Sequence, residues 1–156
     1  MNTPNIQMKI VKVPKTKVDE MILKLYTRIT LDKNKFDYVV GIERGGLNIS
    51  IPLASMLNIP HKSIKISFYN KENKASTVPE VDFYGHQFDK KDKVLLVDDL
   101  IDGSYTVKYF RDNVQCNYKT AVLYWNKYNK NNIKADYYIE EKFINTWLTF
   151  YWEEEK

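Results

Sequence analysis

The chain has 156 residues and a formal net charge of +4 at pH 7, with 44% hydrophobic and 28% charged residues. That size suits one domain with a substantial core, and no stretch approaches the roughly 18 apolar residues of a membrane span. The N-terminus lacks the apolar core of a secretory signal, and the lone thiol of Cys116 excludes an intrachain disulfide or a cysteine-based zinc cluster. We therefore expect a single-domain protein, residues 1–156, in the reducing cytoplasm.

The mild positive charge suits an anionic ligand and is compatible with weak nucleic-acid contact. The chain has neither a dense Lys/Arg stripe nor a zinc-finger or RNA-recognition signature. The charge alone decides nothing. Because these signatures and an apolar span are both absent from the sequence, we expect neither a nucleic-acid partner nor a membrane partner.

The first part of the chain alternates between helical and extended patterns. An amphipathic helical stripe is formed by Val18, Ile22, Leu25 and Ile29. Thr16 and Asp19, at its start, resemble a capping box. Residues 36–43 are rich in β-branched and aromatic residues and predict a buried strand. Residues 47–58 predict a helix, although Pro52 lies near its start.

The later part repeats this alternation around a long polar segment. Residues 61–67 predict a strand, and the segment of about residues 68–92, which contains Pro79 and Gly85, predicts a flexible loop that could act as a lid. The remaining predicted elements are strands 94–97, 120–125 and 136–139 and a helix at 105–114. Strands that alternate with helices indicate an α/β fold with a mainly parallel central sheet flanked by helices. Ligands of such sheets bind beyond the carboxyl ends of the strands, so informative residues should follow each strand directly.

The strongest signal is the acidic strand end KVLLVDDLIDGSYT, residues 93–106. Its apolar strand runs into Asp98 and Asp99, followed by two apolar residues and Asp102. Adjacent carboxylates repel each other unless a cation or a set of hydroxyl donors occupies the space. The small turn at residues 103–106 opens a helix, whose N–H groups and dipole suit a phosphate. This element can therefore hold a sugar phosphate, with acceptors for hydroxyls or Mg²⁺ beside donors for the phosphate.

Two plainer interpretations of the acidic strand end are open. A strand that ends in Asp-Asp is typical of a Walker B element, but no G-x-x-x-x-G-K-[ST] accompanies it in this chain. The aspartates could also serve only as helix caps. The full run of apolar strand, D-D-x-x-D and small polar turn is more specific than either interpretation.

A second polar turn, within VVGIERGGL at residues 39–47, follows the predicted strand 36–43. Arg44 supplies a planar cation suited to phosphate oxygens. Gly45 and Gly46 can adopt positive φ and let backbone N–H groups approach an anion. The alternative is a plain strand–turn–helix in which Arg44 is merely solvated.

The two turns together closely resemble the binding motifs of type I phosphoribosyltransferases for phosphoribosyl pyrophosphate (PRPP). The resemblance implies that Asp98 and Asp99 hold the ribose hydroxyls and Mg²⁺, and that Asp102 lies near the base as the catalytic proton acceptor. The implied PRPP-binding residues are Arg44, Gly45, Gly46, Asp98, Asp99, Asp102, Gly103, Ser104, Tyr105 and Thr106. The family fold also implies a lid loop and a small base-binding hood.

This chain departs from the family pattern at two positions. The phosphate turn of the family usually reads Thr/Ser-Gly-x-Thr, whereas Gly103 and Ser104 have the small and hydroxyl residues exchanged. The pyrophosphate loop commonly has Ser or Ala before Arg-Gly-Gly, whereas this chain has Glu43. The Glu43 carboxylate could hinder pyrophosphate unless it faces away or helps hold a metal. The resemblance further implies a cis peptide between Glu43 and Arg44.

Within the family, the chain is most similar to the 6-oxopurine branch, especially the xanthine-guanine phosphoribosyltransferases. The spacing from Lys127 to Trp147 and the Thr-Trp pair carry this similarity. It implies that Lys127 contacts the purine 6-oxygen, that Trp147 stacks on the ring, and that backbone groups around Leu148 read the 2-position. The base-binding segment would span about residues 126–152. A solvated Lys127 and a packing role for Trp147 are the plainer alternatives.

The expected activity is the Mg²⁺-dependent transfer of a phosphoribosyl group from PRPP to guanine, xanthine or hypoxanthine. The resemblance assigns closing contacts of the lid to Ser67 and Tyr69, and it implies a homo-oligomer, since family members are commonly dimers or tetramers. One alternative is a phosphoribosyltransferase for another nucleobase. The other is a non-catalytic PRPP- or nucleotide-sensing regulator with the same fold.

Overall fold

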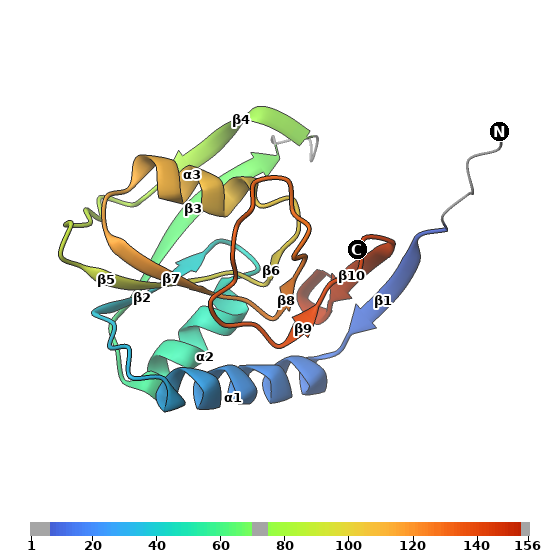
Figure 1. Ribbon diagram of the computed structural model, residues 1–156, viewed down its shortest axis with the longest axis horizontal. Helices are drawn as coiled ribbons and strands as arrows, with labels where there is room; N and C mark the ends of the chain where they lie inside the picture. Colours follow the sequence, from blue (N-terminus) through green and yellow to red (C-terminus); the bar gives the residue numbers. More distant parts are fainter. Residues whose placement is uncertain (1–6, 70–74, 154–156) are drawn as a thin grey trace.

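The computed structural model describes residues 7–69 and 75–153 and has a five-stranded sheet at its centre (Figure 1). Its strands are β2 (Tyr38–Ile42), β3 (His61–Tyr69), β4 (Ala75–Asp82), β5 (Lys93–Val97) and β7 (Asn117–Ala121). They lie in the order β4-β3-β2-β5-β7, and all neighbouring pairs are parallel except β3 and β4. The predicted α/β fold with a mainly parallel sheet is confirmed.

Helices cover both faces of this sheet. The helices α1 (Lys15–Leu31) and α2 (Leu47–Leu57) lie on one face, and α3 (Tyr105–Asn113) lies on the other (Figure 1). Successive side chains of a strand point to opposite faces. Leu95 accordingly packs with the core under α1 and α2, whereas Leu96 packs with the core that includes Phe110 of α3. Because both faces are covered, β5 is apolar along nearly its whole length.

The first helix begins differently from the sequence prediction. Pro14 occupies the N-cap position with φ −73°, and no side chain caps the first turn. Thr16 therefore lies inside α1, and Asp19 pairs with Lys15 at 2.8 Å instead of closing a capping box. The capping-box prediction was wrong because a proline, whose φ is already fixed, favours the helix start just after it. The predicted apolar stripe is buried throughout.

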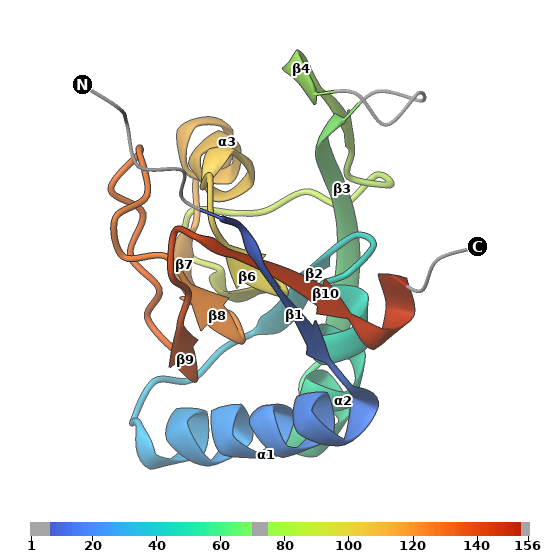
Figure 2. The same ribbon diagram turned by 90° about the vertical axis from the view of Figure 1, so that its right-hand side faces the viewer.

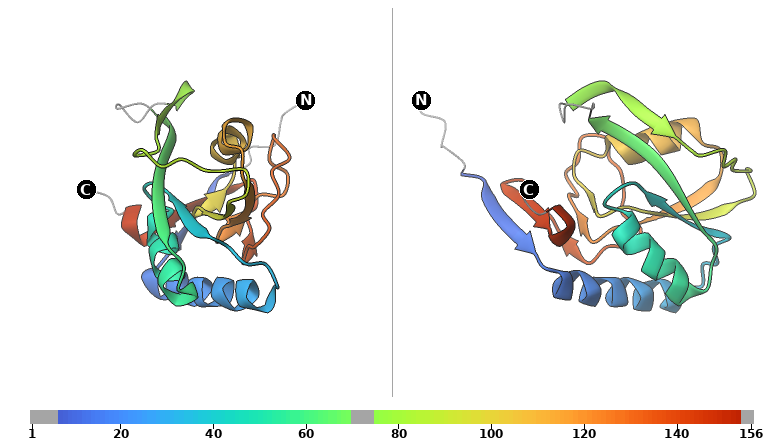
Figure 3. Two further views of the ribbon diagram at one scale, coloured as in Figure 1. Left: turned by 90° about the vertical axis from the view of Figure 1, so that its left-hand side faces the viewer. Right: turned by 180° about the vertical axis from the view of Figure 1, so that it is seen from behind.

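The segment 68–92 is not a loop along its whole length, so that prediction was wrong in part. β3 continues to Tyr69, and β4 returns antiparallel beside it, with Ser67 opposite Glu80. This hairpin rises beyond the other strands of the sheet (Figure 3). β4 lies at the sheet edge, where a strand can be polar on both faces and can contain Pro79. Residues 70–74 of the predicted loop lie outside the described residues.

Two smaller parallel sheets complete the fold. One contains β6 (Leu100–Ile101), β8 (Tyr124–Trp125) and β9 (Glu140–Glu141), and the other pairs β1 (Lys9–Val13) with β10 (Thr146–Phe150). β1 and β10 lie side by side, so the first and the last strand of the chain pair with each other (Figure 2). A short 3₁₀ turn, Tyr151–Glu153, follows β10.

Two predicted strands differ from those observed. The predicted strand 120–125 is divided between β7 and β8, which belong to different sheets. The predicted strand 136–139 is reduced to one bridge between Ala121 and Tyr137. At its start the Asp136 carboxylate accepts the backbone N–H of Thr120 at 2.9 Å. The Asp136 side chain therefore takes the Thr120 N–H group, which a longer strand pairing would have bonded to a backbone carbonyl.

Candidate active site

The adjacent aspartates lie directly after β5, at its carboxyl end. Asp98 Oδ1 accepts the N–H of Asp99 at 2.9 Å, and Asp99 Oδ1 accepts the N–H of Leu100 at 2.7 Å. Both residues keep some solvent exposure but are surrounded by protein on most sides. Within residues 7–69 and 75–153, neither carboxylate forms an ion pair with a lysine or arginine. The structure thus brings two like charges together without a protein cation.

This arrangement makes the charged form of the pair costly. Burial raises the pKa of Asp98 well above its usual range, with a further contribution from the charge of Asp99. Burial also raises the pKa of Asp99, to about 6. Among the described residues no group of three or more His, Cys, Asp or Glu could hold a metal ion. Mg²⁺ often uses one or two carboxylates and completes its shell with water and substrate phosphates. The pair therefore fits an ion that binds together with a phosphorylated substrate.

The glycine turn between β2 and α2 packs directly against this acidic pair. A Cβ on Gly45 would lie 2.3 Å from Asp99 Oδ2, and one on Gly46 would lie 2.4 Å from Ile42 O and 2.8 Å from Val97 O. Neither glycine uses the positive φ that the absence of a side chain would permit. Glycine is required because the turn and the strand ends approach each other too closely for a side chain. The two predicted motifs are therefore in contact.

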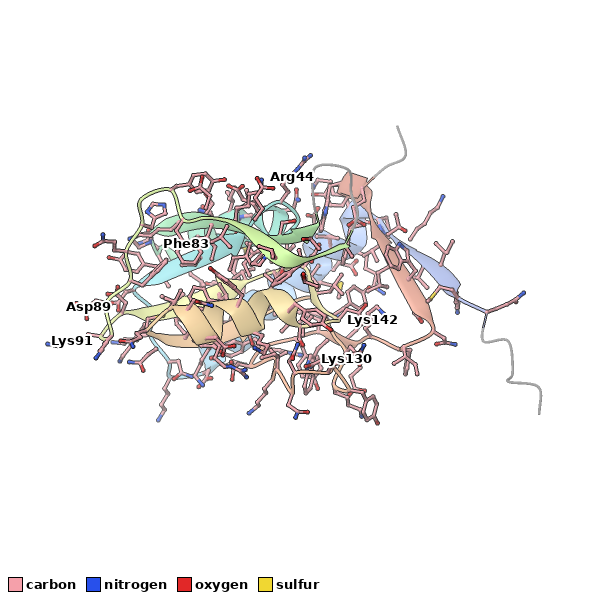
Figure 4. All side chains as sticks on the ribbon, turned by 90° about the horizontal axis from the view of Figure 1, so that it is seen from above. Arg44, Phe83, Asp89, Lys91, Lys130 and Lys142 are labelled. Atoms are coloured by element: carbon pink, nitrogen blue, oxygen red, sulfur yellow. The ribbon has the colours of Figure 1, made fainter. Side chains whose placement is uncertain are left out.

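The pyrophosphate-loop features lie at this turn. The Glu43–Arg44 peptide is cis, as the resemblance implied. In the part of the chain that is described, the N–H groups of Arg44 and Gly45 have no acceptor. Arg44 is exposed, and its guanidinium points outward at the edge of the molecule (Figure 4). Tyr84 donates a hydrogen bond to Glu43 Oε2 at 2.7 Å, and this bond raises the pKa of Tyr84 to about 12. The unusual carboxylate of Glu43 thus has a partner of its own.

The turn at residues 103–106 leads into α3. Ser104 is the N-cap residue with a left-handed φ of 68°, and no side chain caps the first turn of the helix. The first-turn N–H groups therefore remain available for an anion. Ser104 Oγ donates to Gly103 O at 2.5 Å and accepts from Asn131 Nδ2 at 3.0 Å. The Ser104 hydroxyl is thus hydrogen-bonded to protein groups. The backbone of Ser104 has a φ that glycine adopts more readily than serine.

The β3–β4 hairpin contacts this turn. The rings of Phe68 and Tyr105 lie 5.9 Å apart between centroids, and both residues line a surface cavity of about 290 Å³ that also includes Asn131. A larger cavity, of about 430 Å³, lies at the end of α1 and contains none of the predicted site residues. We place the site at the strand ends because the polar groups converge there. The closing roles of Ser67 and Tyr69 stay predictions.

Asp102 lies at the end of the three-stranded sheet β6-β8-β9. The last residues of the three strands, Ile101, Trp125 and Glu141, pair with one another. The residues that directly follow them, Asp102, Asn126 and Lys142, form a row at this end of the sheet. Asn126 Nδ2 donates to Asp102 Oδ1 at 3.2 Å, and Lys142 Nζ lies 3.3 Å from Asp102 Oδ2. The Lys142 side chain is 6% exposed, whereas that of Asp102 is 43% exposed.

The predicted base-binding residues form no hydrogen bond or ion pair with Asp102 in the described part of the chain, and two of them, Trp147 and Leu148, belong to the separate β1–β10 sheet. Lys127 is one residue beyond Asn126, and its Nζ lies 3.4 Å from Glu141 Oε2. Trp147 is 56% exposed on β10, and the neighbouring Leu148 is buried on the opposite face. An exposed indole is free to stack on a ligand. The roles of Lys127, Trp147 and Leu148 stay predictions.

Sequence reasoning missed three residues of this region. Lys142 and Asn126 join Asp102 only because three strands end in register. Trp152 stacks on Phe150, with 4.6 Å between the ring centroids, and its Nε1 lies 3.3 Å from the position of a Cβ on Gly45. The one available signal was that Asn126 follows a predicted strand, as ligand-facing residues do.

Comparisons with known proteins agree with this architecture. Residues 11–154 match the phosphoribosyl transferase domain, and the chain belongs to this family. The expected type I phosphoribosyltransferase fold and enzyme class are therefore confirmed. A comparison with curated proteins gives no match. No helix in the described part of the chain is long and apolar enough to cross a membrane.

Several solved structures share the fold. A purine phosphoribosyltransferase from Pyrococcus horikoshii aligns with a TM-score of 0.75 and 27% identity, over 96% of this chain and 97% of that one. A Helicobacter pylori xanthine-guanine-hypoxanthine phosphoribosyltransferase aligns with a TM-score of 0.72 and 16% identity, over 94% of each chain. A Neisseria gonorrhoeae protein solved with bound ppGpp aligns with a TM-score of 0.71 and 19% identity, over 95% of this chain and 91% of that one.

Proposed function

We propose that the protein transfers the 5-phosphoribosyl group of PRPP to a 6-oxopurine in a Mg²⁺-dependent reaction. The products are a nucleoside 5′-monophosphate and pyrophosphate, as in purine salvage. The observation that carries this proposal is the Asp98–Asp99 end of β5, which forms no ion pair with a lysine or arginine among the described residues, together with an uncapped helix start and a third carboxylate, Asp102. The names of the Pyrococcus horikoshii and Helicobacter pylori relatives, a purine and a xanthine-guanine-hypoxanthine phosphoribosyltransferase, support it.

The transfer breaks the bond between ribose C1 and a pyrophosphate oxygen and forms a bond between C1 and a purine ring nitrogen. C1 becomes positively charged as the leaving group gains negative charge, so fixed charges of opposite sign lower the barrier. Asp98 and Asp99 would hold the ribose hydroxyls and Mg²⁺. The Arg44 side chain would bind the pyrophosphate together with the N–H groups of Arg44 and Gly45, which have no acceptor among the described residues. Gly46 keeps the turn against the strand ends. Mg²⁺, when bound, supplies positive charge to the leaving group.

The 5′-phosphate would bind at the start of α3. The N–H groups of Tyr105 and Thr106 lie in its uncapped first turn, where the helix dipole also favours an anion. Gly103 and Ser104 shape the turn, and Asn131 holds the Ser104 hydroxyl from the side. We assign the phosphate to backbone donors because the Ser104 hydroxyl already has two protein partners.

The base would bind at the end of the three-stranded sheet. As the purine ring nitrogen bonds to C1, the proton on N7 passes to the Asp102 carboxylate. Asn126 fixes Oδ1 of that carboxylate, so its orientation is set before the base arrives. Trp147 would stack on the ring, and backbone groups around Leu148 would read the 2-position. The family resemblance assigns the 6-oxygen to Lys127.

The β3–β4 hairpin would close over the bound substrates. Water that reached C1 would hydrolyse PRPP, so excluding it protects the transfer. Phe68 already contacts Tyr105 of the phosphate turn, and Ser67 and Tyr69 flank Phe68 on the same strand. We further propose that the protein forms a homo-oligomer.

Pyrophosphate release tests the proposal directly. Purified protein, PRPP and Mg²⁺ should release pyrophosphate with guanine, xanthine or hypoxanthine, and mass spectrometry should identify the nucleotide. A chelator should abolish the release. Turnover only with adenine or a pyrimidine would indicate another base. PRPP binding without turnover on any base would indicate a regulator.

A further inference from the structure

Glu43 brings a negative charge to the turn that the proposed function assigns to pyrophosphate. It directly precedes Arg44, and its backbone N–H donates to Ile64 O of β3 at 2.8 Å. Lys65, the next residue of β3, pairs with Glu80 at 2.9 Å and not with Glu43. In the part of the chain that the structure describes, no lysine or arginine forms an ion pair with the Glu43 carboxylate. A protein cation therefore does not neutralise this charge.

A carboxylate that moved freely at this turn would oppose an anionic ligand. Pyrophosphate carries several negative charges, and like charges that lie close together repel each other. A mobile Glu43 could also accept a hydrogen bond from the Arg44 guanidinium or from the N–H of Gly45, and either contact would occupy a donor that the pyrophosphate needs. The turn therefore suits an anion only when this carboxylate is held elsewhere.

Tyr84 is the hydrogen-bond partner of that carboxylate among the described residues. Its hydroxyl donates to Glu43 Oε2 at 2.7 Å, and this bond raises the pKa of Tyr84 to about 12, so the hydroxyl stays protonated at neutral pH. The Tyr84 N–H donates to Asp82 Oδ1 at 2.7 Å, which fixes its backbone in the turn after β4. The neighbouring Phe83 ring packs on Phe88, with 6.3 Å between the ring centroids. The donor is therefore held in place by the protein.

The strand order determines the side from which Tyr84 reaches Glu43. β3 and β4 lie on one side of β2, and β5, which leads into Asp98 and Asp99, lies on the other. Tyr84 follows β4, whereas Asp99 packs against the turn at Gly45 from the β5 side. The hydrogen bond therefore holds the Glu43 carboxylate on the β4 side of the turn, away from the acidic strand end.

We propose that Tyr84 is a positioning residue for PRPP binding, which acts by holding the Glu43 carboxylate away from the pyrophosphate. This inference rests on the proposed function and concerns a feature particular to this chain, since Glu43 departs from the usual family residue. Tyr84 acts through Glu43 and contacts neither the ligand nor the reacting atoms. It should therefore change the affinity for PRPP, leave kcat nearly unchanged, and matter only while residue 43 carries a charge.

The test measures dissociation constants of PRPP and of ribose 5-phosphate by calorimetry in the presence of Mg²⁺. Ribose 5-phosphate lacks the pyrophosphate and is the matched control ligand. In Tyr84→Phe, which removes only the hydroxyl, the Kd of PRPP should rise about threefold to tenfold at low salt. The Kd of ribose 5-phosphate and the kcat at saturating PRPP should each change less than about twofold. Because salt screens exposed charges, the ratio of the variant's Kd for PRPP to that of wild type should approach one at about 1 M salt.

A second variant removes the charge instead of the donor. Glu43→Gln keeps an acceptor for Tyr84, and PRPP should bind to it as tightly as to wild type or more tightly. Tyr84→Phe added to Glu43→Gln should then change the Kd of PRPP by less than about twofold. Tyr26→Phe removes the hydroxyl of a partly buried tyrosine on α1 and serves as the control substitution. Tyr84 is 48% exposed, so its variant should fold, and circular dichroism checks each protein.

Four results would overturn the inference alone. An equal loss for PRPP and ribose 5-phosphate, or the same loss with and without Glu43→Gln, would show that Tyr84 only supports the fold. An unchanged Kd for PRPP in Tyr84→Phe would show that the carboxylate needs no holding. Tighter PRPP binding in Tyr84→Phe, or weaker binding in Glu43→Gln, would show that the charge helps to hold Mg²⁺ with the ligand. If wild-type protein did not bind PRPP at all, the proposed function would fail, and this inference with it.

Discussion

The two acidic strand ends differ in how their charge is balanced. Asp98 and Asp99, after β5, have no cationic partner in the described residues, and burial raises the pKa of both. Asp102, after β6, has a buried lysine 3.3 Å away and an amide on its other oxygen. The negative charge of Asp98 and Asp99 would be neutralised only by a bound cation or by hydroxyl donors of a ligand. The charge of Asp102 is already paired with Lys142, which suits a neutral purine that brings one proton.

This difference follows from the sheets themselves. β5 lies inside a sheet covered by helices on both faces, so the residues directly after it lie close to the packed core. The three-stranded sheet is small, and its strands end together, which allows Asn126 and Lys142 to reach Asp102. The distribution of counter-charge therefore agrees with the proposal that the sugar phosphate binds at the first end and the base at the second.

The largest effect on activity should come from a substitution of Asp102. Asp102→Asn should lower kcat by about 10²–10⁴-fold and leave PRPP affinity nearly unchanged, because the amide cannot accept the N7 proton. Steady-state kinetics and PRPP calorimetry measure the two quantities. Lys142 loses its counter-charge in this variant, so assays should be run well below the measured melting temperature. Wild-type turnover would remove Asp102 from the mechanism.

Alanine substitutions of Gly45 and Gly46 should separate effects on folding from effects on PRPP binding beside Asp98 and Asp99. Gly46→Ala should lower the free energy of unfolding by about 2–4 kcal/mol, because its Cβ would meet two backbone oxygens that cannot move aside. Gly45→Ala should cost less stability, since its Cβ meets the Asp99 side chain, but it should weaken PRPP binding more. Urea unfolding and calorimetry test this ordering. Equal stability losses would contradict it.

Because Asp99 has no cationic partner among the described residues, the stability of the protein should depend on pH. The folded state raises the pKa of Asp99 from its ordinary value of 3.8 to about 6, so folding favours the protonated carboxyl. Its contribution to stability is therefore lost as pH rises from about 4 to about 6. Asp99→Asn should stabilise the unliganded protein by about 1–3 kcal/mol at pH 8 and have little effect near pH 4. The amide oxygen can still accept the N–H of Leu100.

Unfolding curves at both pH values, with and without Mg²⁺, measure this difference. Mg²⁺ should raise the melting temperature of wild-type protein at pH 8 and raise that of Asp99→Asn less. A variant that is less stable than wild type at pH 8 would show that the pair already has a cation in the free protein.

The sequence was sufficient for the phosphate side of the site and insufficient for the base side. Asp98 to Thr106 lie in one continuous segment, so a local pattern could identify them. Lys142 reaches Asp102 through the register of three strands, and no local pattern encodes that register. The role of Lys127, which follows a predicted strand, stays a prediction.

The glycine turn and the hairpin show two further limits of sequence. The sequence showed that Gly45 and Gly46 permit unusual backbone angles, but glycine is needed there because β5 and its carboxyl end approach the turn so closely. β4 is polar and contains Pro79, and only its pairing with β3 makes it a strand. The central strands and the stripe of α1 were predictable because burial imposes a regular apolar period on them.

A smaller effect is expected from the exposed indole near the base. Trp147→Ala should weaken purine binding by about 1–3 kcal/mol, the range found for stacking of a base on an aromatic ring. Its side chain is 56% exposed, so the fold should lose little stability. PRPP affinity should be unchanged. Calorimetry with the purine nucleotide and with PRPP separates the two, and an equal loss for both ligands would place Trp147 outside the base site.

The smallest effect concerns the exchanged residues of the phosphate turn. Ser104 adopts φ 68°, a conformation that costs about 1 kcal/mol for a residue with a side chain. Ser104→Gly relieves this cost but loses the bond from Asn131, so the protein should gain at most about 1 kcal/mol of stability. Ser104→Ala keeps the strain, loses the same bond, and should be less stable than wild type. Because the hydroxyl bonds to Gly103 and Asn131, PRPP affinity should change less than about threefold in both variants. A tenfold loss in both would show that the Ser104 hydroxyl itself binds the 5′-phosphate, and the phosphate would then depend on a side chain as well as on the start of α3.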